Sequence, residues 1–135
     1  MPSTPALSIV VLQWNRSDLT RKCVDSLRAG TVADHELIIV DNGSEPESVQ
    51  FTTDNADIPV LLDHNTGFAR GMNAGLRAAS GEIVAFVNND TRFPKSWDTP
   101  TLETIRAPST GIAVPAVTAG GNRSSVRIEP GTGVV

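Results

Sequence analysis

The sequence predicts an α/β domain in which an open, mostly parallel sheet is covered by helices on both faces. Two observations lead to this fold class. Four short segments are apolar almost throughout, as expected for strands that are buried on both sides. Segments with helical spacing of apolar residues alternate with them, which is the order that places parallel strands side by side. At 135 residues, the chain is long enough for one such domain.

The first strand is expected at residues 6–13, where the run ALSIVVLQ is apolar and rich in β-branched side chains. A helix should follow, because apolar residues then recur every three or four positions. These positions are Leu19, Cys23, Val24 and Leu27. Ser17 or Asp18 is the expected N-cap of this helix, and Gly30 is its expected end.

Two further strands and a short helix are predicted next. ELIIV at 36–40 has the character of a buried strand. The turn-forming sequence DNGSEPES follows at 41–48, and its acidic residues suit the first turn of a short helix. A third strand, VLLD at 60–63, is expected to open after Pro59.

A third helix is predicted between residues 66 and 80, with Gly81 as its C-terminal stop. Gly67, Gly71 and Gly75 are spaced four apart and would lie on one face of this helix. Because an interior glycine costs a helix roughly 0.5–1 kcal/mol relative to alanine, something must approach that face closely. Two explanations stay open: close packing on the sheet and the approach of a ligand.

The next part of the chain contains a fourth strand, a fourth helix and a weak fifth strand. EIVAFV at 82–87 is the fourth strand, and a helix is expected to start near Pro100. GIAVPAV at 111–117 is the fifth strand, weakened by Pro115 because proline cannot donate a ladder hydrogen bond.

The chain is thus expected to divide into one domain at 1–117 and a tail at 118–135 that is rich in glycine and serine. The tail is expected to be poorly ordered or docked on a partner. The single cysteine, Cys23, falls among the apolar helix positions and is interpreted as a packed thiol in a reducing compartment.

Charge and hydropathy exclude some classes of protein. A net charge of −4, with scattered lysines and arginines, argues against a nucleic-acid partner, because such a partner requires a basic surface. The start MPSTPALS does not have the pattern of a signal peptide, and no run approaches the ~20 apolar residues of a membrane span. We expect a cytoplasmic protein, with the inner face of the membrane as an alternative.

Polar residues stand at the ends of the first four predicted strands. WN follows the first strand, DNG the second, DHN the third and NND the fourth. Because ligands of open parallel sheets bind beyond the carboxyl ends of the strands, these residues should meet at one crevice. Each group also has a purely structural interpretation, which is turn formation for DNGS and core packing for Trp14. NND is therefore either a turn or a set of ligands.

Other kinds of site find little support. A zinc site is disfavoured because His64 has no second histidine or cysteine at ligand spacing. A P-loop and a GxGxxG motif are absent, and so is a G-x-S-x-G nucleophile motif. Cys23 lies within a predicted helix, which argues against a cysteine nucleophile. The remaining carboxylates and amides suit a divalent cation bound by one or two carboxylates and substrate phosphates, as Mg²⁺ usually is.

Four motifs resemble the family 2 glycosyltransferases of GT-A fold, especially the branch that includes bacterial rhamnosyltransferase-like enzymes. They are SIVVLQWNRSDLTRKCVDSL, ELIIVDNGS, HNTGFARGMNAGLRAASGEIVAFVNNDT and FPKSW, within about residues 7–117. The resemblance implies an enzyme that takes a sugar from a UDP- or dTDP-linked donor and transfers it with inversion. The acceptor would be a hydroxyl of a glycan or a lipid-linked molecule, as in cell-wall or polysaccharide biosynthesis.

The resemblance also implies roles for individual residues. Asp41 would contact the nucleoside and Trp14 would lie beside the base. The family segment N-x-G-F-x-x-G-x-N, which helps to shape the donor pocket, matches Asn65, Gly67, Phe68, Gly71 and Asn73. The complete set expected to bind the nucleotide sugar is Leu12, Trp14, Asn15, Asp41, Gly67, Phe68, Arg70, Gly71, Asn73, Asn88 and Asn89.

The sequence NND falls where this family carries its Asp-x-Asp metal motif. Asn88 replaces the first aspartate, so Asp90 is the carboxylate expected to hold Mn²⁺ or Mg²⁺ against the diphosphate. The amides of Asn88 and Asn89 are expected to hydrogen-bond ribose or sugar hydroxyls.

The catalytic base of the family, commonly a carboxylate in a Glu-Asp pair, is not found in the sequence. No such pair occurs, and Glu129 is the one acidic residue beyond Glu103. The sequence thus resembles the donor-binding half of a transferase. Three hypotheses stay open: a transferase that is truncated or completed by a homo-oligomer or partner chain, a non-catalytic nucleotide-binding module, and a degenerate fragment with an open sheet edge.

Overall fold

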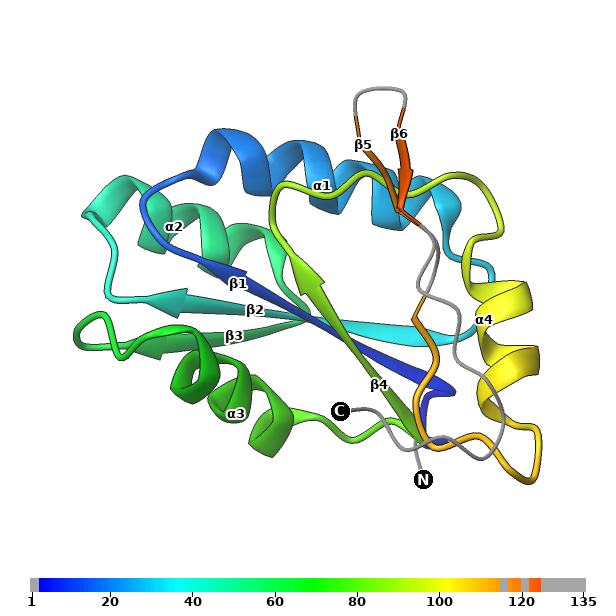
Figure 1. Cartoon of the computed structure of the whole chain (residues 1–135). Coiled ribbons are helices and arrows are strands. Elements are labelled where there is room, and N and C mark those ends of the chain that lie inside the picture. The colour runs from blue at the N-terminus through cyan, green and yellow to red at the C-terminus, as the bar shows by residue number, and fades with distance from the viewer. Residues whose placement is uncertain (1–2, 115–116, 120–121, 125–135) are drawn as a thin grey trace.

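The computed structural model describes residues 3–114, 117–119 and 122–124. Its centre is a four-stranded sheet in the order β3-β2-β1-β4, in which every neighbouring pair is parallel. The strands are β1 (Leu7–Gln13), β2 (His35–Asn42), β3 (Ile58–Leu62) and β4 (Ile83–Asn88). The predicted parallel α/β sheet is therefore confirmed (Figure 1).

Helices connect the strands and lie on both faces of the sheet. They are α1 (Ser17–Gly30), α2 (Pro46–Asn55), α3 (Phe68–Ala78) and α4 (Asp98–Ile105). α1, α2 and α4 contribute to one hydrophobic core, whereas α3 packs on the opposite face (Figure 1). Successive side chains of a strand point to opposite faces, so strands with apolar residues throughout can serve both cores.

The larger core lies under α1. β1 contributes Leu7, Ile9 and Val11 to it, and α1 contributes Cys23 and Leu27, each at most 2% exposed. The burial of Cys23 confirms its interpretation as a packed thiol.

α3 approaches the sheet through two of its glycines. A β-carbon at Gly75 would lie 2.3 Å from Val10 Cγ1 and 2.9 Å from Val40 Cγ2. One at Gly71 would lie 2.5 Å from Leu12 Cδ1. These separations are too short for a methyl group, so close packing on the sheet explains both glycines.

The predicted ends of two helices were wrong. The N-cap of α1 is Arg16 and not Ser17 or Asp18, and it makes no side-chain capping hydrogen bond. α3 ends at Ala78, since Ala79 is already extended. Gly81 lies beyond the helix, where its N–H donates to Ser8 Oγ at 2.8 Å. A β-carbon at Gly81 would approach the same oxygen to 2.6 Å, so the glycine is explained by its contact with β1 and not by helix termination.

The predicted fifth strand at 111–117 was also wrong. Residues 111–114 form no strand, and 115–116 lie outside the described residues. β5 (Val117–Ala119) instead pairs antiparallel with β6 (Asn122–Ser124). β5 thus begins at the last residue of the predicted domain, and β6 lies in the predicted tail. The remainder of the tail, 125–135, lies outside the described residues.

Within the described part of the chain, no helix has the length and apolar character needed to cross a membrane.

Candidate functional site

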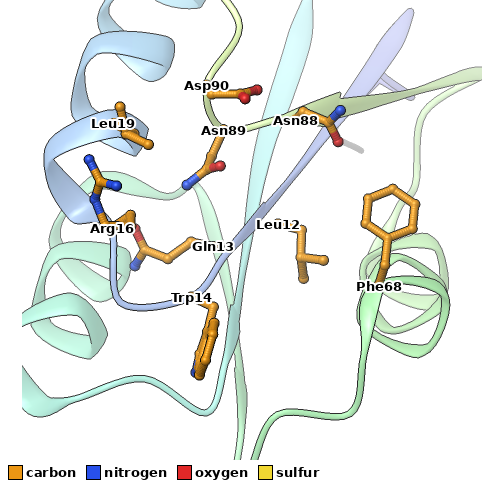
Figure 2. A pocket seen from close by; sticks show the side chains of 9 residues that line it. All are labelled: Leu12, Gln13, Trp14, Arg16, Leu19, Phe68, Asn88, Asn89 and Asp90. Carbon is orange, nitrogen blue, oxygen red and sulfur yellow. The ribbon is translucent and has the colours of Figure 1, made fainter.

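A pocket of about 260 Å³ lies at the carboxyl ends of β1 and β4. It is lined by Leu12, Gln13, Trp14, Arg16, Leu19, Phe68, Asn88, Asn89 and Asp90. In Figure 2, the residues after β4 lie at the top of the pocket, Trp14 at the bottom, Phe68 of α3 on the right and Arg16 on the left. Residues that follow β1 and β4 therefore meet at one cavity, together with Leu19 of α1 and Phe68 of α3. The residues that follow β2 and β3 were expected at the same crevice, but they do not line the pocket.

Six residues of the predicted site line this pocket. They are Leu12, Trp14, Phe68, Asn88, Asn89 and Asp90. Both aromatic side chains are largely open to solvent, Trp14 at 54% exposure and Phe68 at 61%. Trp14 is therefore part of the pocket wall and not of the core.

The sequence NND is both a turn and a part of the pocket. The N–H of Thr91 donates to the carbonyl of Asn88 at 3.1 Å, which closes the turn after β4. Asn89 Nδ2 donates to Thr20 Oγ1 at 3.1 Å, which attaches the turn to α1. The side chains of Asn88 and Asp90 are exposed to solvent. The turn thus holds two polar side chains at the cavity while its backbone is fixed.

Asp90 provides one carboxylate to the pocket. Among the described residues, no group of three histidine, cysteine, aspartate or glutamate side chains could enclose a metal ion. One carboxylate with neighbouring amide oxygens fits a cation that takes most of its ligands from water and substrate phosphates, as Mg²⁺ does. The donor set suits a metal that arrives with a phosphorylated ligand, and it does not suit a permanently enclosed structural ion.

Asp41 lies beneath the pocket and not in its wall. Its side chain is fully buried, and its two oxygens accept from Ser44 N at 2.8 Å and from Gln13 Nε2 at 3.2 Å. Gln13 Nε2 also donates to Ser48 O and Thr52 Oγ1 of α2, at 2.8 and 2.7 Å. Gln13 Oε1 is buried without a hydrogen-bond partner among the described residues. The pair connects β1, β2 and α2 under the cavity.

Two asparagines join the loops that follow the strands. Asn15, with φ of 54°, accepts from Glu45 N at 2.7 Å, and its own N–H donates to Ser44 Oγ at 2.9 Å. Asn42 accepts from Thr66 N at 2.9 Å and donates to Gly67 O at 3.3 Å. The loops after β1, β2 and β3 are therefore held together by side chains at the edge where the pocket lies.

The other predicted residues of α3 do not line this pocket. Gly67 precedes the helix with φ of 84°, a conformation that favours glycine, and Gly71 packs against Leu12. Arg70 and Asn73 line a separate hollow on α3. Gly71 thus supports the pocket from behind, through Leu12.

Three residues that line the pocket were not predicted from the sequence: Gln13, Arg16 and Leu19. Arg16 could have been predicted from its position, because it directly follows Trp14 and Asn15 in the loop after β1. Its Nε donates to Asp18 Oδ1 at 2.9 Å, and this hydrogen bond lowers the pKa of Asp18 to about 2. Arg16 and Asp90 give the pocket one charge of each sign.

Comparison with known proteins agrees with this architecture. A family model described as glycosyl transferase family 2 matches residues 8–129. The uncharacterized glycosyltransferase YibD of Escherichia coli (strain K12) is 33% identical over 104 residues, which is 73% of this chain and 30% of YibD. The uncharacterized glycosyltransferase EpsJ of Bacillus subtilis (strain 168) is 33% identical over 90 residues, which is 64% of this chain and 26% of EpsJ.

Solved structures show the same fold at lower identity. The mannosyltransferase PcManGT from Pyrobaculum calidifontis, in complex with GDP-Man and Mn²⁺, superposes with a TM-score of 0.64 at 23% identity. That match covers 79% of this chain and 34% of PcManGT. S. aureus TarS 1-349 matches with a TM-score of 0.64 at 23% identity, over 73% of this chain and 32% of that one. The chain therefore spans about a third or less of the length of these proteins. Given the family match over most of its length and the shared GT-A fold, the chain belongs to glycosyl transferase family 2.

Proposed function

We propose that this chain forms the donor-binding part of a glycosyltransferase that uses a nucleoside-diphosphate sugar. The observation that carries the proposal is the convergence of five predicted donor-binding residues and the predicted metal ligand Asp90 on one pocket at the carboxyl ends of β1 and β4. Open parallel sheets bind nucleotides at this edge, beyond the carboxyl ends of their strands. Family membership supports the same class of reaction.

The nucleoside is proposed to bind against Trp14. The indole is exposed in the pocket wall, and an aromatic face of this kind stacks on any nucleobase. Asn88 and Asn89 offer amide groups that can donate to and accept from ribose or sugar hydroxyls. Because Asp41 is fully buried, it contributes by holding the Ser44 N–H and the Gln13 amide in place.

The diphosphate is proposed to lie between Arg16 and Asp90. Arg16 is exposed, and its ion-pair partner among the described residues is Asp18, which is exposed as well, so phosphate oxygens can replace that partner at little cost. Asp90 would hold Mn²⁺ or Mg²⁺ against the diphosphate, and the Mn²⁺ present with GDP-Man in PcManGT supports a divalent metal. Such a metal would offset the negative charge that develops on the leaving diphosphate.

The transfer itself is proposed to be a direct displacement that inverts the anomeric carbon. The chain's own residues bind and orient the donor, which is UDP- or dTDP-linked in this proposal, and the acceptor is a hydroxyl of a glycan or lipid-linked molecule. No residue of this sequence is proposed as the base that deprotonates the acceptor.

Calorimetry with metal and nucleotide sugars tests the assignment. UDP-, dTDP- and GDP-sugars should be titrated into the chain with and without Mn²⁺, and at least one should bind more tightly with the metal present. Asp90→Ala should remove this difference, because it deletes the pocket's one carboxylate. Asp63→Ala is the matched control, since Asp63 is exposed and does not line the pocket. A metal effect that survives in Asp90→Ala would overturn the role of Asp90.

A non-catalytic nucleotide-sugar-binding module is the second candidate. It is favoured by one specific observation, the absence of a Glu-Asp pair from the 135 residues. Formation of a glycosylated product by this chain with any acceptor would reject it. Metal-dependent donor binding without transfer would favour it.

A further inference from the structure

A second hollow, distinct from the donor pocket, lies along the outer side of α3. It measures about 220 Å³ and is lined by Leu62, Thr66, Arg70, Asn73, Ala74 and Arg77. None of these residues lines the first pocket. The hollow therefore needs an explanation of its own.

Its wall is a stripe of one helix that carries two arginines. Arg70, Asn73, Ala74 and Arg77 are spaced three, four and seven apart, so they lie on the same side of α3. Seven residues of helix place the two arginines about 10 Å apart along the axis. α3 contains no acidic residue, so this side of the helix is positively charged within a chain whose net charge is −4.

The two guanidinium groups are unpaired within the described residues. The ion pairs found there are Arg16–Asp18 and Arg106–Glu82, and neither Arg70 nor Arg77 donates a side-chain hydrogen bond. Asp63 is next to Leu62 in sequence, but it does not line the hollow. Each guanidinium thus has five N–H groups available to a ligand.

The remaining lining groups suit a small polar anion on an apolar base. Leu62 and Ala74 supply the apolar surface, and Asn73 supplies an exposed amide. Thr66 Oγ1 donates to Asn42 Oδ1 at 3.0 Å, which fixes the position of this hydroxyl at one end of the hollow. The guanidinium fork matches the geometry of phosphate oxygens, and two such groups can grip one phosphate or two linked phosphates.

We infer that this second pocket binds a phosphate-bearing group through Arg70 and Arg77. The phosphate can belong to a free anion or to a lipid headgroup, and both offer the same oxygens to the arginines. The inference does not depend on the proposed donor site, because the two pockets share no residue.

An NMR titration with pyrophosphate at constant ionic strength tests the inference. We expect saturable shifts of the amides of residues 66–77 and of the side-chain Nε signals of Arg70 and Arg77. The variant Arg70→Gln/Arg77→Gln should weaken binding about tenfold or more, as expected when charge-assisted hydrogen bonds are lost. Lys22→Gln/Lys95→Gln is the matched control, since it removes two exposed positive charges elsewhere. Shifts that do not saturate, or equal weakening in the control, would overturn the inference.

A sedimentation assay distinguishes the two sources of phosphate. Phosphatidylcholine vesicles with and without phosphatidic acid should be compared for the wild type and both double variants. Binding that needs phosphatidic acid and both arginines identifies a lipid headgroup, whereas pyrophosphate binding without vesicle binding identifies a free anion. The titration is carried out without divalent metal, and the amides of residues 88–90 should not shift together with those of 66–77, which separates this pocket from the donor site.

Discussion

At positions 88–90, the backbone makes the turn and the side chains face the pocket. The bond from Thr91 N to Asn88 O closes the turn, and the Asn89 amide ties it to Thr20. The carboxylate of Asp90 stays free to meet a ligand in the described structure. The sequence alone did not distinguish a turn from a set of ligands. Both descriptions hold, because the turn uses the backbone atoms of these residues and the pocket uses their side chains.

A substitution of Trp14 tests whether the nucleoside binds in the donor pocket. Trp14→Ala should weaken binding of a nucleotide or nucleotide sugar by roughly 1–3 kcal/mol, because stacking on an aromatic side chain contributes about that much. The thermal midpoint should change little, since the side chain is 54% exposed. Calorimetry measures the affinity, and Trp14→Phe should retain most of it. Unchanged affinity in the alanine variant would contradict the placement of the base.

Cys23 should be unreactive in the folded chain. Burial raises the pKa of its thiol to about 11, with a smaller contribution from Asp90 in the same direction. Since the thiolate is the reactive form, labelling by DTNB near pH 8 should be at least about a hundredfold slower than in unfolded chain. The same reaction in concentrated guanidinium chloride is the control. Rapid labelling without denaturant would show that α1 opens readily.

At the scale of elements, the sequence located every strand of the main sheet to within a few residues. Buried strands and amphipathic helices carry their periodicity in the sequence, so four strands and the helices between them could be predicted. The ends of the helices were harder to predict from the sequence. α3 ends at Ala78, and Gly81 contacts Ser8 instead of ending the helix. This contact could not be predicted, because Ser8 lies on a strand far away in the sequence.

The close packing of α3 on the sheet gives a prediction for Gly75. Gly75→Ala would place a methyl group 2.3 Å from Val10 Cγ1. Overpacking of this kind costs about 1–3 kcal/mol, which exceeds the roughly 0.5–1 kcal/mol that alanine gains in a helix. Urea unfolding should therefore show a net loss of stability.

Gly111→Ala is the matched control for Gly75→Ala, because nothing lies within 4 Å of the added carbon. Its unfolding free energy should stay within about 0.5 kcal/mol of the wild type. A stabilised Gly75→Ala variant would mean that α3 can move away from the sheet without cost.

At the scale of the whole molecule, Glu36 joins segments far apart in the chain. Its carboxylate accepts from Ser8 Oγ at 2.6 Å, from Ser80 N at 2.7 Å and from Ser80 Oγ at 2.9 Å. Desolvation alone would raise the pKa of Glu36, but the hydrogen bonds from Ser8 and Ser80 lower it below its ordinary value. The amino ends of β1 and β2 and the segment before β4 are thereby connected.

This depressed pKa makes folding sensitive to acid. A carboxyl group with a lower pKa in the folded state stabilises the fold above its unfolded pKa, about 4.3 for glutamate, and loses this effect as pH falls through the folded value. The free energy of unfolding should therefore decrease below about pH 4.5. Denaturant titrations over this range should show a weaker decrease in Glu36→Gln. Glu103→Gln, an exposed change on α4, is the control, and identical curves for wild type and Glu36→Gln would refute the argument.

Local patterns in the sequence are enough to predict the α/β class, the parallel sheet and the sheet edge at which polar residues lie, because periodicity and strand ends are local properties. Which of those residues reach the pocket depends on the tertiary structure. It placed Asp41 beneath the cavity, added Gln13, Arg16 and Leu19 to its wall, and moved Arg70 to a separate hollow. The physical reason is that side-chain direction and burial depend on contacts between segments far apart in the chain, and no local pattern records them.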